Sequence, residues 1–251
     1  MKEELLKYLL AEEAHAFKGW DFSYLNGRWD SEELPWNYND FVKKYLKDSD
    51  NILDMGTGGG ELLLSFNHPY DKTSVTEAYE PNIKLCQETL SPLGINVYPI
   101  KQDDVLTGIK DNHFDIVLNH HESYLESEVY RVLKSNGIFI TQQVGAYNNN
   151  DLASFFDESR KIQFPKMTLE KSIKRLEDAS FEILYANEAY PKIKFYDLGA
   201  IAYFAKIIEW EFINFTVKSN INKFEILEKE LEKNGYIEST EHRFIIIARK
   251  K

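Results

Sequence analysis

The stretch Ile52-Leu53-Asp54-Met55-Gly56-Thr57-Gly58-Gly59-Gly60-Glu61 decides the fold class of this chain. Two apolar residues and an aspartate end a predicted strand, four glycines follow within five positions, and a predicted helix begins at Leu62. Glycine lets the backbone turn sharply and leaves no side chain between the loop and a bound ligand. Such a loop presents a ligand to a helix N-terminus at the edge of a parallel sheet. A tight turn without a ligand is the alternative, but one turn rarely needs so many glycines.

The spacing of these glycines argues against a dinucleotide cofactor. The dinucleotide fingerprint requires glycine at the first, third and sixth positions of the turn. Counted from Gly56 the sixth position is Glu61, and counted from Gly58 it is Leu63. A pyrophosphate would also meet the acidic side chain of Glu61 near the helix start. A nicotinamide-dependent oxidoreductase is therefore the last of the alternatives.

Short apolar strands alternate with helical segments beyond residue 50. We predict strands at 51–54, 74–78, 95–100, 114–119 and 138–142, and helices at 60–66, 81–90, 123–133 and 151–156. This alternation indicates a parallel sheet covered by helices on both faces. The remaining predicted elements are a helix at 167–176, a strand at 181–188, a long apolar helical insertion at 195–212, a helix at 222–234 and a last strand at 242–248.

Composition and charge limit the classes of protein to which the chain can belong. It has 251 residues, of which 43% are apolar, and a formal net charge of −11. This acidity argues against a nucleic-acid partner, since such proteins carry basic surfaces. No apolar run approaches the roughly 18 residues of a membrane span, and the N-terminus lacks the pattern of a signal peptide. The single cysteine, Cys86, excludes an internal disulfide. We expect a cytoplasmic enzyme without a membrane partner.

The chain contains no repeats or linkers, so we predict one domain over residues 1–251. Residues 1–48 are expected to form an N-terminal helical cap or lid, residues 49–145 the cofactor-binding core, and residues 190–220 a late insertion on the substrate side. Aromatic residues are frequent in the cap and in the insertion, and Trp36 and Tyr196 are the candidates there for contacts with a substrate. Packing in the hydrophobic core is the alternative for both segments.

Four motifs, in the expected order and spacing, resemble the class I S-adenosylmethionine (SAM)-dependent methyltransferases of the type 11 kind. They are the Asp-x-Gly-x-Gly-x-Gly loop at 54–60, a carboxylate after the second strand, the strand Phe114–Leu118, and the Arg131–Gly137 segment. In that last segment we expect Gly137 to close the preceding helix. The resemblance covers Ile52 to about Val144. It implies a Rossmann-like α/β fold with a seven-stranded, mostly parallel sheet whose last strand, containing Ile245–Ala248, is antiparallel.

The resemblance further implies SAM as the methyl donor and S-adenosylhomocysteine as the product. The residues expected to bind it are Asp54, Gly56, Thr57, Gly58, Gly60, Glu77, Asp103, Asp104 and Asn119. A carboxylate at the end of the second strand fixes the ribose hydroxyls, and Glu77 is favoured there over Glu80. An acidic residue after the third strand accepts from the adenine amine in this family. Asp103 is favoured over Asp104, and capping of the following turn is the alternative.

The residues that follow the fourth strand are the candidates for catalysis. His121, His120 and Glu122 would lie at the edge of the sheet where a base could deprotonate a hydroxyl or an ammonium acceptor. Capping of the next helix is the competing explanation. The two histidines and Glu122 lack a further ligand at a recognisable spacing, so no metal site is predicted. At the end of the fifth strand, one of Gln142 and Gln143 is expected to orient the substrate, and Gln143 is the candidate.

Together these features predict a SAM-dependent methyltransferase that transfers a methyl group to an O, N or C centre of a small molecule by in-line displacement. An RNA or protein methyltransferase is one alternative, and a non-catalytic protein that binds SAM or S-adenosylhomocysteine is another. The Asn/Asp-Pro-Pro-Tyr motif of amino-methylating nucleic-acid enzymes is absent, because Asn119 is followed by His-His-Glu. Cys86 lies in a predicted helix and does not match the catalytic cysteine of cytosine-methylating enzymes.

Overall fold

The chain folds into two compact units, each assembled from segments that are distant in the sequence. The computed structural model describes residues 2–17, 21–101 and 104–251. The accessory unit comprises residues 1–35, 145–165 and 189–243, and the core unit comprises residues 36–144, 166–188 and 244–251. The predicted cap thus divides, because its last part, from Trp36 onward, lies in the core unit. The prediction of one domain, with its cap, core and insertion, stays a prediction.

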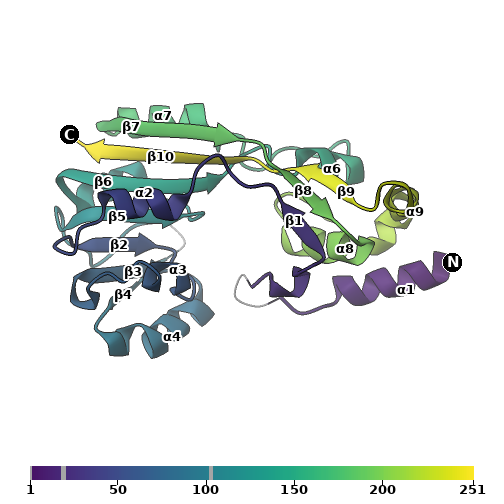
Figure 1. Ribbon diagram of the computed structural model, residues 1–251, viewed down its shortest axis with the longest axis horizontal. Coiled ribbons are helices and arrows are strands. Elements are labelled where there is room, and N and C mark those ends of the chain that lie inside the picture. Colours follow the sequence, from purple (N-terminus) through teal and green to yellow (C-terminus); the bar gives the residue numbers. More distant parts are fainter. Residues whose placement is uncertain (1, 18–20, 102–103) are drawn as a thin grey trace. The chain divides into compact units, whose positions relative to one another are not determined.

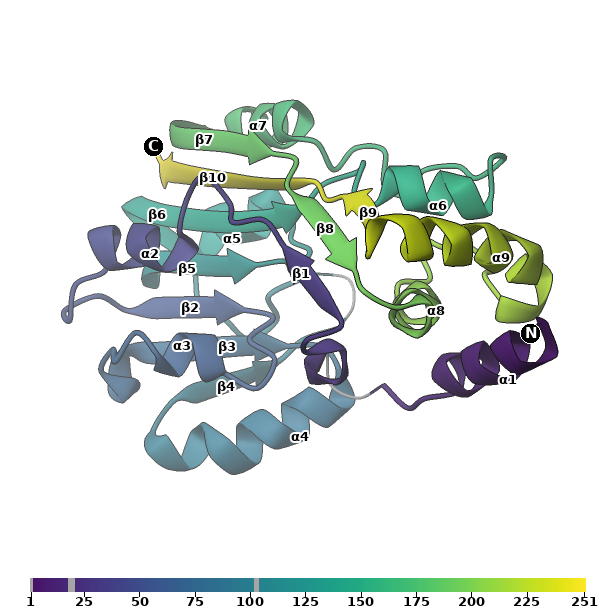
Figure 2. The ribbon, with the colours of Figure 1, turned by 45° about the vertical axis from the view of Figure 1, so that its right-hand side comes forward.

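The core unit contains a seven-stranded sheet in the order β4-β3-β2-β5-β6-β10-β7 (Figure 1). The strands are β2 (Ile52–Met55), β3 (Thr73–Glu77), β4 (Asn96–Pro99), β5 (Phe114–His120), β6 (Leu133–Val144), β7 (Phe181–Ala189) and β10 (Arg243–Lys250). The pairs β2–β3, β2–β5, β3–β4 and β5–β6 are parallel. Figures 1 and 2 show β10 running opposite to β6 and β7. The predicted mostly parallel sheet with its antiparallel last strand is confirmed.

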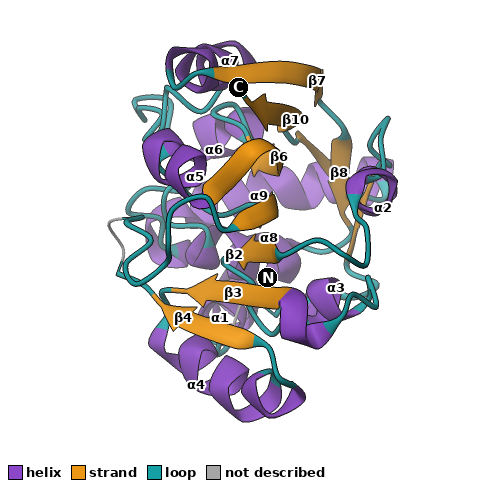
Figure 3. Ribbon diagram, turned by 90° about the vertical axis from the view of Figure 1, so that its left-hand side faces the viewer, coloured by secondary structure: helices purple, strands orange, loops and turns teal. Residues whose placement is uncertain are grey.

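Helices cover both faces of this sheet, as Figure 3 shows. Successive strand residues point to opposite faces, so Ile52 and Ile116 pack on one face while Leu53 and Val117 pack on the other. The first face is covered by α2 (Tyr38–Tyr45), α3 (Glu61–Leu64) and α4 (Glu80–Thr89), and the second by α5 (Glu126–Val132) and α7 (Leu169–Asp178). Short 3₁₀ turns lie at Tyr70–Lys72 and Ser91–Leu93. The central strands β2, β5 and β10 are largely apolar on both sides because both sides are buried.

The connection from α5 to β6 differs from the prediction that Gly137 closes the helix. The helix ends at Val132 and the strand begins at once, but the pairing with β5 jumps from Leu133 to Ile138. The residues between form a bulge, and Asn136, with φ of 64°, adopts the left-handed conformation expected of the glycine. Gly137 is needed for space, because a Cβ there would lie 2.8 Å from the carbonyl of Lys134.

The accessory unit contains a three-stranded antiparallel sheet in the order β1-β8-β9. Its strands are β1 (Trp29–Ser31), β8 (Lys192–Phe195) and β9 (Ile237–Thr240), and its helices are α1 (Lys2–Glu13), a 3₁₀ turn at Ser23–Leu25, α6 (Asn150–Phe156), α8 (Leu198–Ile207) and α9 (Val217–Asn234). The prediction of one helical segment over 195–212 is wrong. Phe195 ends a strand, and Asp197 starts the helix by accepting the N–H of Ala200 at 2.7 Å, as a helix N-cap does.

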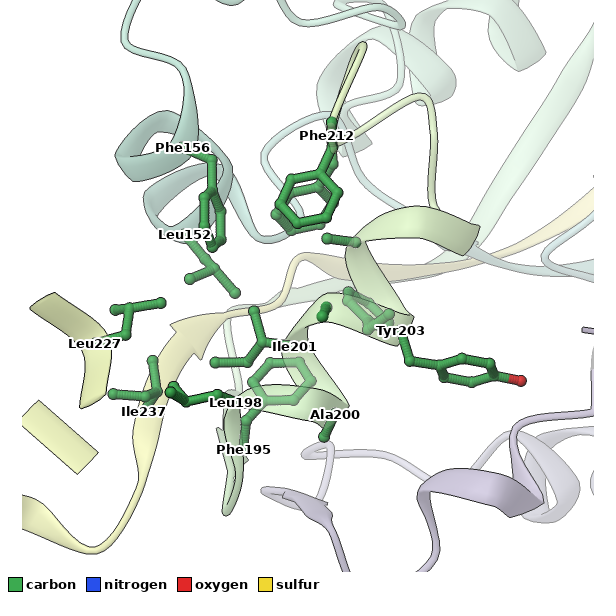
Figure 4. Packing of buried hydrophobic residues seen from close by; sticks show 14 of the residues in the cluster. Leu152, Phe156, Phe195, Leu198, Ala200, Ile201, Tyr203, Phe212, Leu227 and Ile237 are labelled. Atoms are coloured by element: carbon green, nitrogen blue, oxygen red, sulfur yellow. The ribbon is translucent and has the colours of Figure 1, made fainter. Parts of the chain in front are cut away.

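The core of the accessory unit is built around α8, in which every residue from Leu198 to Ala205 is buried. Figure 4 shows apolar side chains from strands β8 and β9, from helices α6, α8 and α9 and from the segment between α8 and α9 gathered in one cluster; they include Phe156, Phe195, Ile201, Phe212, Leu227 and Ile237. A helix that is apolar all round is a buried helix. No helix in the described part of the chain is both long and apolar enough to cross a membrane.

Candidate functional site

The glycine loop leaves β2 at its carboxyl end and bonds to the neighbouring strand. The backbone N–H groups of Gly56 and Thr57 both donate to the Thr76 carbonyl of β3, at 3.1 and 3.2 Å. Gly56, Gly58 and Gly60 have φ values of 62°, 61° and 84°. This is the left-handed region that glycine enters at little cost. The alternate spacing of the glycines is therefore required by the turn itself.

The surroundings of the three glycines differ. A Cβ added to Gly56 would lie 2.4 to 2.7 Å from side-chain atoms of Glu122, and one added to Gly60 would lie 2.9 Å from Leu90. A Cβ added to Gly58 would meet no atom within 4 Å. Protein packing thus explains the absence of a side chain at Gly56 and Gly60. At Gly58 the space beside the backbone is open to a ligand.

Glu77, at the end of β3, is joined to this loop. One carboxylate oxygen accepts the N–H groups of Ala78 and Tyr79 at 2.9 and 3.0 Å. The other accepts the N–H of Gly58 at 3.0 Å and the Asn82 amide at 3.4 Å. The side chain is only 5% exposed. A buried carboxylate with several N–H donors stays in one position, and the long contact from Asn82 is the weakest of the four.

The alternative carboxylate, Glu80, lies on the surface at the start of α4. It is exposed and forms a 3.8 Å ion pair with Lys84. The structure therefore brings Glu77 to the glycine loop and leaves Glu80 at the surface, and the role of Glu77 toward a ribose stays a prediction.

Asp54 is the next-to-last residue of β2, just before the glycine loop. Burial raises the pKa of its carboxyl group to about 7, the negative charge of Glu77 adds to the rise, and the nearby Thr57 hydroxyl opposes it. A carboxyl group in this state ionises readily when a positive charge is placed beside it. This part of the site suits a cationic group of a ligand.

Three polar atoms near the ends of β2 and β5 are buried without a hydrogen-bond partner in the described residues: Thr57 Oγ1, the Tyr38 hydroxyl and Asn119 Nδ2. The strand register places Asn119 opposite Met55. The two hydroxyls lie near Asp54 and near the Asn119 backbone, respectively, but without hydrogen-bond geometry. Buried polar atoms are nearly always paired, so these atoms fit a polar ligand. Together with the two carboxylates they suit SAM, which carries hydroxyl groups and positive charge.

His120 and His121 lie at the end of β5 with their rings stacked at a centroid distance of 4.1 Å. Both rings contact the Gln142 side chain from the neighbouring strand β6, through their Nε2 atoms at 2.9 and 3.3 Å. The Trp36 indole N–H donates to the oxygen of the same amide at 2.7 Å. The structure thus brings together two predicted catalytic residues and one predicted substrate residue, Trp36.

Glu122 follows the histidines and lies against the glycine loop. Burial raises the pKa of its carboxyl group, and the negative charges of Glu77 and Asp104 add to the rise. Its backbone carbonyl accepts the Gln143 amide at 2.9 Å. The same amide nitrogen also bonds Asn119 at 2.6 Å. Gln143 is buried, and its amide fixes the positions of Asn119 and of the Glu122 backbone.

The remaining predicted site residues have different placements. Asp104 has a φ of 57° and accepts the Ser123 hydroxyl at 2.7 Å, so it lies beside Glu122. Asp103 lies outside the described residues. Tyr196 belongs to the accessory unit, where its side chain is 42% exposed. Its role as a substrate contact stays a prediction.

Two contributors to this site were not predicted from the sequence. The Tyr38 ring packs against His120 at 4.7 Å, and the Cys86 thiol donates to the Gly58 carbonyl at 3.2 Å. Tyr38 lies in a short amphipathic helix and Cys86 in an ordinary one, so neither carried a chemical motif. Among residues 2–17, 21–101 and 104–251, no three His, Cys, Asp or Glu side chains form a metal-binding group.

The sheet order, the glycine loop after β2 and the acidic residue at the end of β3 are typical of a class I methyltransferase domain. Residues 53–141 match the family model described as a methyltransferase domain. In fold, the chain is similar to a solved candidate methyltransferase from Bacillus halodurans, with a TM-score of 0.55, 18% identity, and coverage of 85% of this chain and 98% of that one. The predicted resemblance to the class I SAM-dependent methyltransferases is confirmed by this match over residues 53–141 and by the fold.

Other similarities are more distant in sequence or more partial in length. A functionally unknown protein from Deinococcus radiodurans has a TM-score of 0.58 at 11% identity, with coverage of 99% of this chain and 98% of that one. A ribosomal protein L11 methyltransferase from Dictyoglomus thermophilum is 28% identical over 128 residues, which are 49% of this chain and 42% of the relative. One from Caldicellulosiruptor bescii is 26% identical over 123 residues. The match thus spans about two fifths of the length of these curated relatives.

Proposed function

We propose that this protein transfers the methyl group of SAM to a small-molecule acceptor and releases S-adenosylhomocysteine. The observation that carries the proposal is the buried Glu77 carboxylate, which is bonded to the N–H of Gly58 where the loop is open. SAM supplies a methyl carbon that its sulfonium makes electrophilic. The protein has to hold the donor and the acceptor in line and exclude water.

The donor would be held by residues at the carboxyl ends of β2, β3 and β5. Glu77 would accept the ribose hydroxyls, the open face of Gly58 would allow close approach, and Asp54 would face positive charge. The unpaired atoms of Thr57 and Asn119 would bond the polar groups of the ligand. Asp103 or Asp104 would accept from the adenine amine, as in the family.

Glu122 is the candidate general base in this proposal, because burial raises the pKa of its carboxyl group toward the range useful for proton transfer. His120 and His121 remain candidates, although their Nε2 atoms are engaged by Gln142. We propose that Trp36 and Gln143 contribute to the acceptor side of the site indirectly. Trp36 holds the Gln142 amide, and Gln143 holds Asn119 and the Glu122 backbone. A cytoplasmic location is part of the proposal and fits a chain with one cysteine and no disulfide.

A protein acceptor is the second candidate. The observation that favours it is the partial similarity to relatives named as ribosomal protein L11 methyltransferases. Against an RNA acceptor stands the net charge of −11, since phosphate-binding surfaces are basic.

Calorimetry with SAM and with NADH on the purified protein tests the donor. We expect binding of SAM and S-adenosylhomocysteine only; preference for NADH, or binding of neither nucleotide, would contradict the proposal. Transfer of labelled methyl groups from SAM to a metabolite library, with ribosomal protein in a parallel arm, identifies the acceptor.

The Glu122→Gln variant tests the base. We expect it to retain SAM binding and to lose at least about 100-fold in transfer rate, which is the ordinary contribution of a general base. An unchanged rate would exclude Glu122. Failure of every acceptor with intact SAM binding would favour a non-catalytic SAM-binding protein.

A further inference from the structure

Four side chains of the core unit form a hydrogen-bonded chain at the ends of β5 and β6. The Trp36 Nε1 atom lies 2.7 Å from Gln142 Oε1. The Gln142 Nε2 atom lies 2.9 Å from His120 Nε2 and 3.3 Å from His121 Nε2. Gln142 is buried, and its hydrogen-bond neighbours come from two other segments of the sequence, one with Trp36 and one with the two histidines.

The donor and acceptor roles in this chain follow from the chemistry of its first member. An indole nitrogen can only donate a hydrogen bond, so the atom of Gln142 that faces Trp36 must be the amide oxygen. The orientation of the amide, which otherwise has to be assigned, is therefore fixed. The other end of the amide is an NH₂ group with two hydrogens. It faces two imidazole nitrogens, so each ring can accept one of the hydrogens.

An imidazole nitrogen that accepts a hydrogen bond carries no proton. The Nε2 atoms of His120 and His121 are therefore unprotonated, and the proton of each ring is on Nδ1. Protonation at either Nε2 would place two donors against each other. The stacked arrangement, with centroids 4.1 Å apart and planes at 20°, also disfavours two positive rings because like charges at this distance repel each other.

The backbone and the neighbouring groups hold this arrangement in place. Residues His120 and Gln142 are paired in the β5–β6 register, and the N–H of His121 donates to the Gln142 carbonyl at 2.8 Å. The Tyr38 ring of α2 packs on His120 at 4.7 Å, and burial keeps the pKa of its hydroxyl well above the ordinary value. The Tyr38 hydroxyl therefore stays neutral and places no negative charge beside the histidines. Glu122 is the next residue in the sequence, and its carboxylate lies against Gly56.

We propose that Gln142, oriented by Trp36, is a positioning residue that keeps both histidines neutral with their protons on Nδ1. In this state neither Nε2 atom is available as a general base. The pair then acts through hydrogen bonding, and proton removal from an acceptor falls to Glu122. This catalytic consequence rests on the proposed function, whereas the protonation state of the histidines does not.

The tautomer of each histidine can be read from long-range ¹H–¹⁵N correlation spectra of the ¹⁵N-labelled full chain without SAM. The same spectrum contains two internal references. His68 Nε2 donates to the Asp50 carbonyl at 2.9 Å and must be protonated. His242 Nδ1 accepts the Tyr147 N–H at 3.1 Å and must be unprotonated. We expect His120 and His121, assigned with His120→Asn and His121→Asn variants, to show unprotonated Nε2 and thus to differ from both references.

Three variants test the cause of this state. In Gln142→Glu the carboxylate can only accept, so we expect the proton to move to Nε2 in at least one of the two rings. In Trp36→Phe the amide loses its fixed orientation, and we expect both rings to exchange between tautomers. Tyr38→Phe is the matched control: it keeps the ring that packs on His120 and removes a hydroxyl without a hydrogen-bond partner in the described residues. The tautomers should not change in this control.

A protonated Nε2 in either wild-type ring would overturn the proposal, and this result does not depend on any variant folding. Unchanged spectra in Gln142→Glu would show that Gln142 does not set the tautomer. Unchanged spectra in Trp36→Phe would show that Trp36 does not orient the Gln142 amide. Because the spectra are recorded without SAM, they are independent of whether the protein transfers a methyl group. A failure of the proposed function would appear in calorimetry or in the transfer assay.

Discussion

Asp54 is expected to make SAM binding depend on pH near neutrality. Its pKa in the protein is about 7, because the carboxyl group is buried and lies near the charge of Glu77. The positive charge of SAM favours the carboxylate form, so the pKa falls when SAM binds, and a proton is released. The affinity of SAM is therefore greatest well above the Asp54 pKa of about 7 and decreases as the pH falls through the pKa of the free protein.

The size of this effect follows from the fraction of Asp54 that is ionised. With a pKa of about 7, about one carboxyl group in eleven is ionised at about pH 6 and about ten in eleven at about pH 8. The dissociation constant of SAM should therefore rise about tenfold between about pH 8 and about pH 6, equivalent to about 1.4 kcal/mol. Calorimetry in buffers of different ionisation enthalpy measures both the affinity and the proton release.

The Asp54→Asn variant is the control, because an amide of nearly the same shape cannot titrate. It reports the pH dependence of every other group, including the amino group of SAM itself. We expect weak binding of SAM at both pH values and no proton release from this position. If the wild type and the variant show the same pH dependence, Asp54 does not face the positive charge of SAM, and the prediction is wrong.

Three further predictions concern stability, the loop and the thiol. Lys250→Met should lower the free energy of unfolding in urea by about 3 kcal/mol, because the buried ammonium donates to two backbone carbonyls and an amide oxygen; a loss below about 1 kcal/mol would contradict this. Gly58→Ala and Gly60→Ala should each cost about 1–2 kcal/mol of backbone strain, but only Gly58→Ala should weaken SAM binding more than about tenfold, and equal binding losses would argue against the open face as the ligand side. Burial raises the pKa of the Cys86 thiol to about 11, so a thiol reagent at about pH 8 should label it only after unfolding, whereas rapid labelling of the native protein would contradict its burial.

Much of the fold of the core unit could be predicted because the sequence patterns that specify it lie within single short segments. The alternate glycines at 56, 58 and 60 all have positive φ, and the central strands β2 and β5 are largely apolar on both faces, as a covered parallel sheet requires. Glu77 could be preferred over Glu80 because it ends an apolar strand. Where local signals were ambiguous, the prediction failed: Gly137 resembles a helix terminator, but the left-handed residue is Asn136.

The accessory unit and the histidine network could not be predicted from local patterns. An apolar run such as 195–212 can form a strand or a buried helix, and its hydrophobic pattern does not distinguish them. The N-cap at Asp197 marks where the helix begins, but this hydrogen bond is visible only in the folded structure. The bond between Trp36 and Gln142 joins residues 106 positions apart. Trp36 meets Gln142 because Trp36 lies just before α2, and α2 packs on the face of the sheet that carries the Gln142 side chain. The spacing of residues in the sequence does not show this contact.

The arrangement of the two units in the sequence has a consequence for how the chain is made. Neither unit is continuous, and β10, which lies between β6 and β7, is formed by residues 243–250. During synthesis the nascent chain can pair β2 to β6 early, but β7 has no neighbour in the sheet until β10 has been made. The edge of β6 therefore stays open as a template for pairing with other strands until β10 leaves the ribosome. Fragments that end before residue 243 should expose this edge permanently, which makes truncated forms prone to aggregation.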